Sequence, residues 1–170
     1  MKKILFFTAL LSAPLLAANL VLAQKKNQLE GVWRVVEVIV PGQNSGKDTT
    51  ISTPQPGIVI FTKNYYSIVV IQSAQPRTAA DQPKDAQNLT DAEKIARFTE
   101  WSPLVANSGT YEIKGSTILR HPIVAKSVAV MNNQNPLADD FTLEGTSTLR
   151  ITPAADRAGI RPKVKLTRLE

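Results

Sequence analysis

The segment LEGVWRVV at residues 29–36 sets the pattern for the rest of the chain. It begins a run, Gly31–Val40, in which β-branched and aromatic residues predominate, as is typical of a β-strand. Side chains alternate between the two faces of a strand. Strict alternation therefore puts Trp33 and Glu37 on one face and Arg34 on the other.

Similar runs, separated by Gly, Asn, Pro and Asp, continue along the sequence. This succession is typical of an antiparallel all-β domain and predicts about eight to ten strands. The expected strands are Gly31–Val40, Thr49–Thr53, Gly57–Thr62, Tyr65–Ile71, Gly109–Ile113, Thr117–Val124, Ser127–Met131, Phe141–Leu143, Ser147–Thr152 and Lys163–Arg168. Short polar connections such as Lys114-Gly115 are typical of tight hairpins.

One segment in the middle of the chain predicts a helix. Thr90 followed by Glu93 forms a capping box, and Pro103 marks a stop, so the helix is expected from Asp91 to about Trp101. Its apolar residues share one face at helical spacing: Ile95, Phe98 and Trp101. We expect this face to pack on the sheet or over an opening, so that residues 73–101 act as a lid or a plug.

Charged residues give the phase of the later strands. Glu112 is expected to face water, which turns Tyr111 inward. In the strand Thr117–Val124, the charge of Arg120 predicts that the opposite face is the inner one. The residues on that face are Leu119, His121 and Ile123.

The last strand places an arginine on an apolar face. Lys163 and Lys165 mark its wet side, so Arg168 points inward, where a guanidinium without a partner is costly. If the first and last strands are neighbours, as closing a barrel requires, Trp33 presents its indole to Arg168. We predict a structural latch between these two side chains, worth on the order of 2 kcal/mol if desolvated.

The inner-face residues suggest a small-molecule site. The predicted ligand-binding residues are Glu37, Tyr111, Leu119, His121 and Ile123. Glu37 and His121 are also candidate catalytic acids or bases. A structural role remains open for each polar residue: a histidine bonded to a carbonyl, a glutamate paired with a basic side chain, and a core tyrosine.

Composition excludes several kinds of site. The chain has no cysteine and one histidine, which rules out disulfide scaffolds, thiolate metal sites and multi-histidine metal sites. Asp139-Asp140 is interpreted as a solvated turn, and we expect no metal and no cofactor. The formal net charge of +6 is too mild to indicate a nucleic-acid partner.

The first 23 residues are typical of an export signal. A basic start at Lys2-Lys3 precedes an apolar run that ends in small residues, and cleavage is expected before Gln24. We therefore expect one domain over residues 24–170, no membrane anchor after cleavage, and a periplasmic or secreted bacterial protein.

Gly31-Val32-Trp33, with an arginine on the last strand, resembles the lipocalin pattern. Three blocks in order are similar to the bacterial lipocalin-like domain family: residues 29–36, residues 108–113 and the strand that carries His121. The resemblance implies a calycin-type, up-and-down antiparallel β-barrel of about eight strands with a small-molecule cavity. The short helix would be an addition in mid-chain.

Three functions remain open at this point. The first is an exported protein that binds a small, largely hydrophobic molecule inside the barrel. The second is an isomerase or cyclase in which Glu37, Tyr111 or His121 moves a proton, and the third is a filled barrel with a structural or interaction role. The residues favour binding over catalysis and leave the oligomeric state open.

Overall fold

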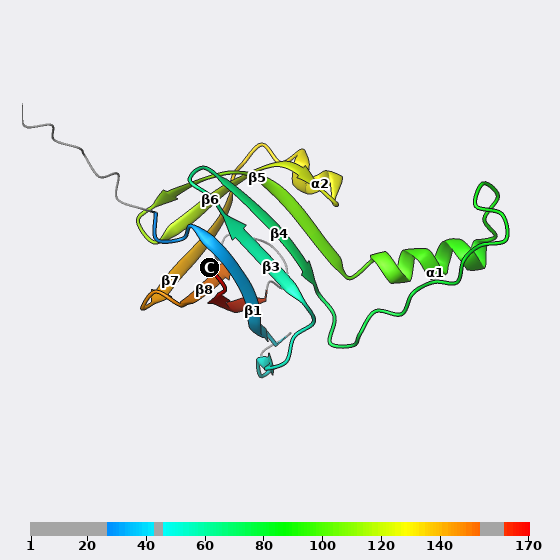
Figure 1. Cartoon of the computed structure of the whole chain (residues 1–170), viewed down its shortest axis with the longest axis horizontal. Helices are drawn as coiled ribbons and strands as arrows, with labels where there is room; N and C mark the ends of the chain where they lie inside the picture. Colours follow the sequence, from blue (N-terminus) through cyan, green and yellow to red (C-terminus); the bar gives the residue numbers. More distant parts are fainter. Residues whose placement is uncertain (1–26, 43–45, 154–161) are drawn as a thin grey trace, which may run out of the picture.

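The computed structural model describes residues 27–42, 46–153 and 162–170 (Figure 1). The expected export signal at residues 1–23 lies outside the described residues. The described elements are β1 (Gly31–Val40), β2 (Thr49–Ile51), β3 (Gly57–Phe61), β4 (Tyr65–Ile71), α1 (Asp91–Trp101), β5 (Leu104–Lys114), β6 (Thr117–Ala125), α2 (Val128–Met131), β7 (Leu137–Glu144), β8 (Thr148–Pro153) and β9 (Lys163–Arg168). The structure confirms the all-β class.

The strands form a closed antiparallel barrel. The sheet order is β2-β1-β3-β4-β5-β6-β7-β8-β9, and β1 also pairs with β9. Eight strands thus make the ring, and β2 is an additional short strand. Consecutive ring strands after β3 are neighbours, which confirms the up-and-down topology.

Along one of its edges, strand β1 pairs with two different strands. Its first half, Gly31–Arg34, pairs with β3, whereas Val38–Val40 pairs with β2. Its other edge pairs with β9 along most of its length. Because β1 leaves β3 halfway along, the wall of the barrel opens at that end.

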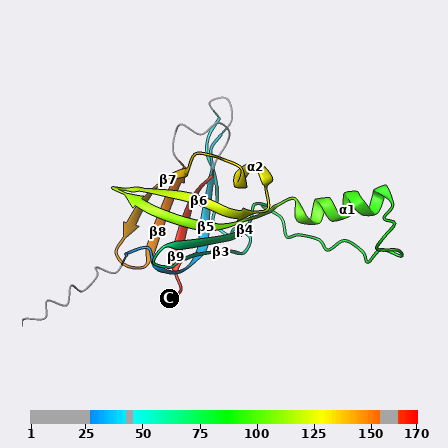
Figure 2. The same cartoon turned by 90° about the horizontal axis from the view of Figure 1, so that it is seen from above.

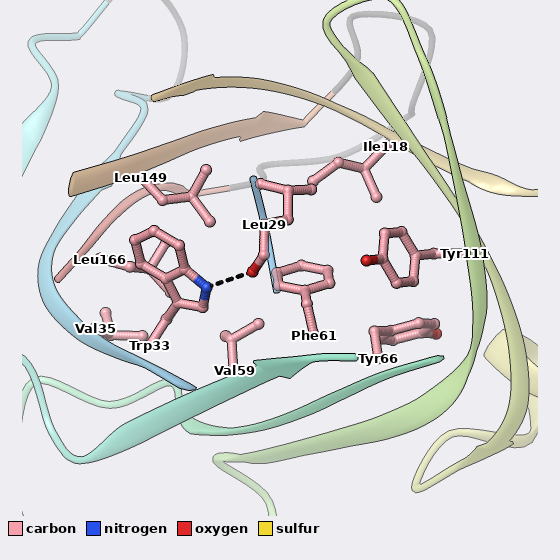
Figure 3. Packing of buried hydrophobic residues seen from close by; sticks show 10 residues of the cluster. All are labelled: Leu29, Trp33, Val35, Val59, Phe61, Tyr66, Tyr111, Ile118, Leu149 and Leu166. Atoms are coloured by element: carbon pink, nitrogen blue, oxygen red, sulfur yellow. Dashed lines mark hydrogen bonds between the residues drawn. The ribbon is translucent and has the colours of Figure 1, made fainter. Parts of the chain in front are cut away.

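The apolar core fills the other end of the barrel (Figure 3). Its most deeply buried large side chains are Trp33, Leu29, Ile118, Leu149 and Leu166. Phe61 and Tyr111 pack edge to face, with ring centroids 5.1 Å apart. These residues come from the segment before β1 and from six ring strands, so the core ties the ring together.

The mid-chain helix forms at the expected residues but not in the expected place. Thr90 caps α1, and the Glu93 side chain accepts a hydrogen bond from the Thr90 backbone, which completes the capping box. However, α1 extends away from the barrel in both orientations (Figures 1 and 2). The expectation that its apolar face packs on the sheet or plugs an opening is therefore wrong.

The predicted strand Ser127–Met131 is also wrong, because residues 128–131 form the short helix α2. β-branched composition was the only signal there, and among the described residues no strand pairs with this segment to supply backbone hydrogen bonds. Of the helices that the structure describes, none has the length and apolar character to span a membrane.

Candidate functional site

Trp33 and Arg168 meet at the closed end of the barrel. The two residues face each other across the β1–β9 pair, and the guanidinium carbon lies 4.1 Å from the indole centroid. The Trp33 Nε1 donates to the Leu29 carbonyl at 2.8 Å (Figure 3). Trp33 is therefore held on one side by the chain before β1 and on the other by the last strand.

Arg168 also binds three backbone carbonyl groups that were not predicted to lie near it. Its guanidinium donates to the carbonyls of Gln28, Glu30 and Thr146. The contact therefore joins the N-terminal turn, the β7–β8 connection and the end of β9. Its contribution to stability remains a prediction.

Gly31 is required by this arrangement. Its φ is +140°, a backbone conformation that residues other than glycine rarely adopt. A Cβ there would overlap the Glu170 carbonyl oxygen and lie 2.5 Å from Nη1 of Arg168. The glycine of the Gly-x-Trp pattern thus allows the last strand and its arginine to approach Trp33.

Tyr111 points inward, as phasing predicted, but its hydroxyl is already occupied. It donates to the Thr62 carbonyl at 2.7 Å and accepts from Nδ2 of Asn27 at 2.6 Å. Burial, with a smaller effect from the charge of Glu30, raises the pKa of Tyr111 to about 12. This tyrosine closes one end of the barrel rather than lining a cavity.

Glu37 faces outward, so the prediction of an interior position is wrong. The β1–β9 register shifts between Val35 and Glu37, which inserts Val36 and reverses the alternation beyond it. Glu37 then lies 3.8 Å from Arg150 on β8, as an ion pair on the outer surface. The same bulge turns Val38 inward.

The inner and outer faces of β6 are also the reverse of the prediction. Ile118 is 1% exposed and Arg120 points inward, whereas Ile123 is 66% exposed. The His121 side chain is 47% exposed and lies 3.4 Å from Glu112, and Leu119 shares that outer face. Leu119, His121 and Ile123 are therefore not interior residues.

The predicted orientation of the β6 side chains was wrong because Arg120 is buried and forms an ion pair with Asp139. Its Nε donates to the Asp139 carboxylate at 2.8 Å, and Nη1 donates to Asn107 at 3.2 Å. Asp139 is 3% exposed and lies within β7, so the solvated turn predicted at Asp139-Asp140 is wrong. A buried arginine is tolerated when a carboxylate and further acceptors surround it.

Tyr66 lies beside this polar pair. The Arg120 guanidinium is 5.3 Å from its ring centroid, and burial raises the pKa of the Tyr66 hydroxyl. This hydroxyl is buried without a hydrogen bond among the described residues. Sequence reasoning missed the cluster because its members come from β4, β5, β6 and β7.

A cavity of about 310 Å³ lies where β1 separates from β3. Its walls are mostly apolar and come from β1, β2, β4, β9 and the loops beside them. The lining residues are Val35, Val38, Val40, Ile51, Pro54, Gln55, Val70, Ile71, Gln72, Ser73, Ala74, Pro162 and Val164. None of the residues predicted to bind a ligand is among them.

The absence of a side chain at Gly57 leaves room for Val35 and Val70 beside the cavity. A Cβ at this position would lie 2.9 Å from Val70 and 3.0 Å from Val35, both of which line the space. One lining residue could be found from the sequence, because alternation with Lys163 and Lys165 places Val164 on the inner face of the last strand. The extent of the cavity could not, because the bulge in β1 decides that Val38 joins it.

The chemistry of the cavity is that of an apolar binding site. The described side chains that line it include no acid, base or histidine, and Gln55, Gln72 and Ser73 supply its polar side chains. Within the described residues, no group of three or more His, Cys, Asp or Glu side chains is arranged to hold a metal ion.

The chain has distant similarity to solved protein structures. Three solved structures are similar: a lipocalin-like protein from Bacteroides uniformis (14% identity, TM-score 0.41), a redesigned β-barrel (13%, 0.40) and an uncharacterized protein from Bacteroides eggerthii (10%, 0.40). They cover 84%, 84% and 82% of this chain, and the chain covers 100%, 93% and 98% of theirs.

No curated protein matches the chain significantly. The model of the lipocalin-like domain family matches residues 30–142, which is more than half of the sequence. This match begins at Glu30, immediately before the Gly-x-Trp pattern, and ends within β7. The chain belongs to the lipocalin-like domain family.

Proposed function

We propose that this protein is an exported lipocalin-like protein that binds a small, largely hydrophobic molecule in the cavity between β1, β4 and β9. The observation that carries the proposal is the cavity itself, about 310 Å³ in volume and walled mainly by valine, isoleucine and proline. That volume is at the lower end of the range typical of ligand sites, roughly 300–1,000 Å³. The ligand is therefore small.

The wall chemistry favours an apolar ligand with a few polar atoms. Val35, Val38 and Val70 offer no hydrogen bond, so transfer of apolar ligand surface from water is the main driving force. Gln55 and Gln72 are available to orient one polar group. Among the residues that the structure describes, no ionised side chain lines the space to attract a charged ligand.

The alternative functions have less support. An isomerase or cyclase needs an acid or a base beside its substrate, and Glu37 and His121 lie on the outer surface, away from the cavity lining. A filled barrel is disfavoured by the cavity. Export rests on the signal pattern of residues 1–23.

Titration with N-phenyl-1-naphthylamine, an uncharged fluorescent probe, tests the binding proposal. We expect one site per chain in the parent protein. Val70→Trp fills the cavity and should weaken binding by roughly tenfold or more, whereas Thr142→Trp, on the exposed face of β7, should leave it within about twofold. Equal binding by both variants, or no binding by the parent, contradicts the proposal.

Export has its own test. Expression in a Gram-negative host, osmotic-shock fractionation and N-terminal sequencing should yield a periplasmic chain that starts at Gln24. Recovery of a chain that starts at Met1 in the cytoplasm contradicts export and leaves the binding proposal to be judged separately.

A further inference from the structure

Helix α1 turns its apolar face to solvent. Three large side chains make up this apolar stripe: Ile95 is 66% exposed, Phe98 73% and Trp101 54%. No residue of α1 is buried. An amphipathic helix in a globular protein normally buries such a face against another apolar surface. Among the described residues, the stripe of α1 has no such surface packed against it.

The arm that carries α1, residues 72–103, holds the stripe in this orientation. On the opposite face of the helix, Glu100 accepts a hydrogen bond from the Ala80 backbone at 3.0 Å, so the preceding part of the arm covers the charged side. At the base of the arm, Lys126 donates to the carbonyls of Trp101 and Ser102. Both contacts turn the apolar stripe outward.

The barrel has an uncovered apolar surface that matches the stripe in character. Strand β3 has the sequence GIVIF and is apolar on both faces, a pattern typical of strands that are buried on both sides. Its outward residues Ile58 and Ile60 are 45% and 37% exposed, and Val69 on β4, directly opposite Ile58, is 48% exposed. We call these three residues the outer patch.

We propose that two copies of this chain exchange arms, so that the apolar stripe of each copy packs on the outer patch of the other. Each stripe exposes roughly 400 Å², given that one aromatic side chain can bury about 150–250 Å². The three residues of an outer patch together expose roughly 250 Å², so two stripes on two outer patches bury up to roughly 1,300 Å² in total, within the range of stable interfaces. A single docked arm gives half of that, so the exchange is reciprocal and two-fold.

Docking of the stripe on its own barrel is disfavoured by the base of the arm. Ser102 and Pro103 alone separate α1 from β5, and the φ angle of proline is fixed. The helix also extends away from the barrel from that point (Figures 1 and 2). If α1 folded back onto β3 and β4 of its own barrel, the hydrogen bonds from Lys126 to the end of the helix would break.

The charge of the arm disfavours a membrane as the partner. The arm carries four basic and five acidic side chains, whereas helices that lie on anionic membranes are rich in lysine and arginine. Its acidic side chains also disfavour a nucleic acid. An apolar protein surface is the partner that suits the stripe, and this chain supplies one.

Cross-linking tests which surfaces meet, since the chain contains no cysteine of its own. Thr99→Cys lies beside the stripe and Ser67→Cys lies opposite Ile60, and neither change removes a stripe or patch residue. Mixing the two single variants under oxidising conditions should give a disulfide-linked dimer. A disulfide within one chain in the double variant, or cross-linking of Thr99→Cys with itself, overturns the proposal.

Sedimentation equilibrium of the whole chain tests the assembly without cysteines. We expect the parent to be a dimer, with Phe98→Lys raising the dimer dissociation constant by roughly 10- to 100-fold. Ala96→Lys is the matched control, because residue 96 is exposed but lies off the stripe, and it should change the constant by less than about threefold. A monomeric parent, or equal effects of both variants, overturns the proposal.

Discussion

Replacing Arg168 with methionine removes the guanidinium and keeps most of the apolar stem. The variant loses the contact with the Trp33 ring, at 4.1 Å from its centroid, and the hydrogen bonds to three backbone carbonyls. Trp33 is fully buried, so the contact with its ring is partly desolvated and worth about 1–2 kcal/mol.

The three hydrogen bonds of Arg168 contribute less to the free energy of unfolding than three fully buried hydrogen bonds would. Those to Gln28 and Thr146 are exposed, so water replaces the guanidinium there. The one to Glu30 is half-buried and accounts for roughly a further 1–2 kcal/mol. We therefore expect Arg168→Met to lower the free energy of unfolding by about 3 kcal/mol, which corresponds to a Tm lower by roughly 6–12 °C.

Urea unfolding monitored by tryptophan fluorescence measures this change. Arg34→Met is the matched control, because Arg34 lies beside Trp33 on the exposed face of β1, and it should cost less than about 0.5 kcal/mol. If Arg168→Met unfolds within that margin of the parent, the latch does not stabilise the closed barrel and the reasoning fails.

Three further predictions concern the polar groups of the barrel. Arg120→Met or Asp139→Leu alone should each cost about 3–5 kcal/mol in urea unfolding, whereas the double variant should regain most of it, because removing one partner leaves the other charge buried without this ion pair. The pKa of Tyr111 is raised to about 12, so its protonated form stabilises the fold below pH 10, and this contribution is lost as the pH rises towards 12. The stability advantage of the parent over Tyr111→Phe, followed by circular dichroism, should therefore shrink across that window; a constant advantage contradicts the assignment. Glu37→Gln and His121→Ala change outward side chains, so the affinity for N-phenyl-1-naphthylamine should stay within about twofold, and a larger loss would place either residue at the site.

The sequence predicted the elements whose information is local. The capping box at Thr90 and the helical spacing after it depend on contacts within one turn, and α1 forms as expected. For the same reason, alternation correctly predicted that Tyr111 points inward. The closing contact between β1 and β9 followed from an arginine that had to be received on an apolar face.

Alternation failed at a bulge within β1 and at a buried charge pair between β6 and β7. One inserted residue, Val36, reversed the rest of β1, so Glu37 faces water and Val38 enters the cavity. Arg120 faces inward because Asp139, from another strand, receives it.

The sequence by itself determined the strands and the helix, because backbone preference, side-chain period and capping act between near neighbours, whereas the closed barrel was expected from the resemblance to lipocalin-like domains. Only the tertiary structure decided where the cavity lies and which face of α1 is free. Those features depend on bulges, on buried charge pairs and on the path of the arm, which involve residues far apart in the chain.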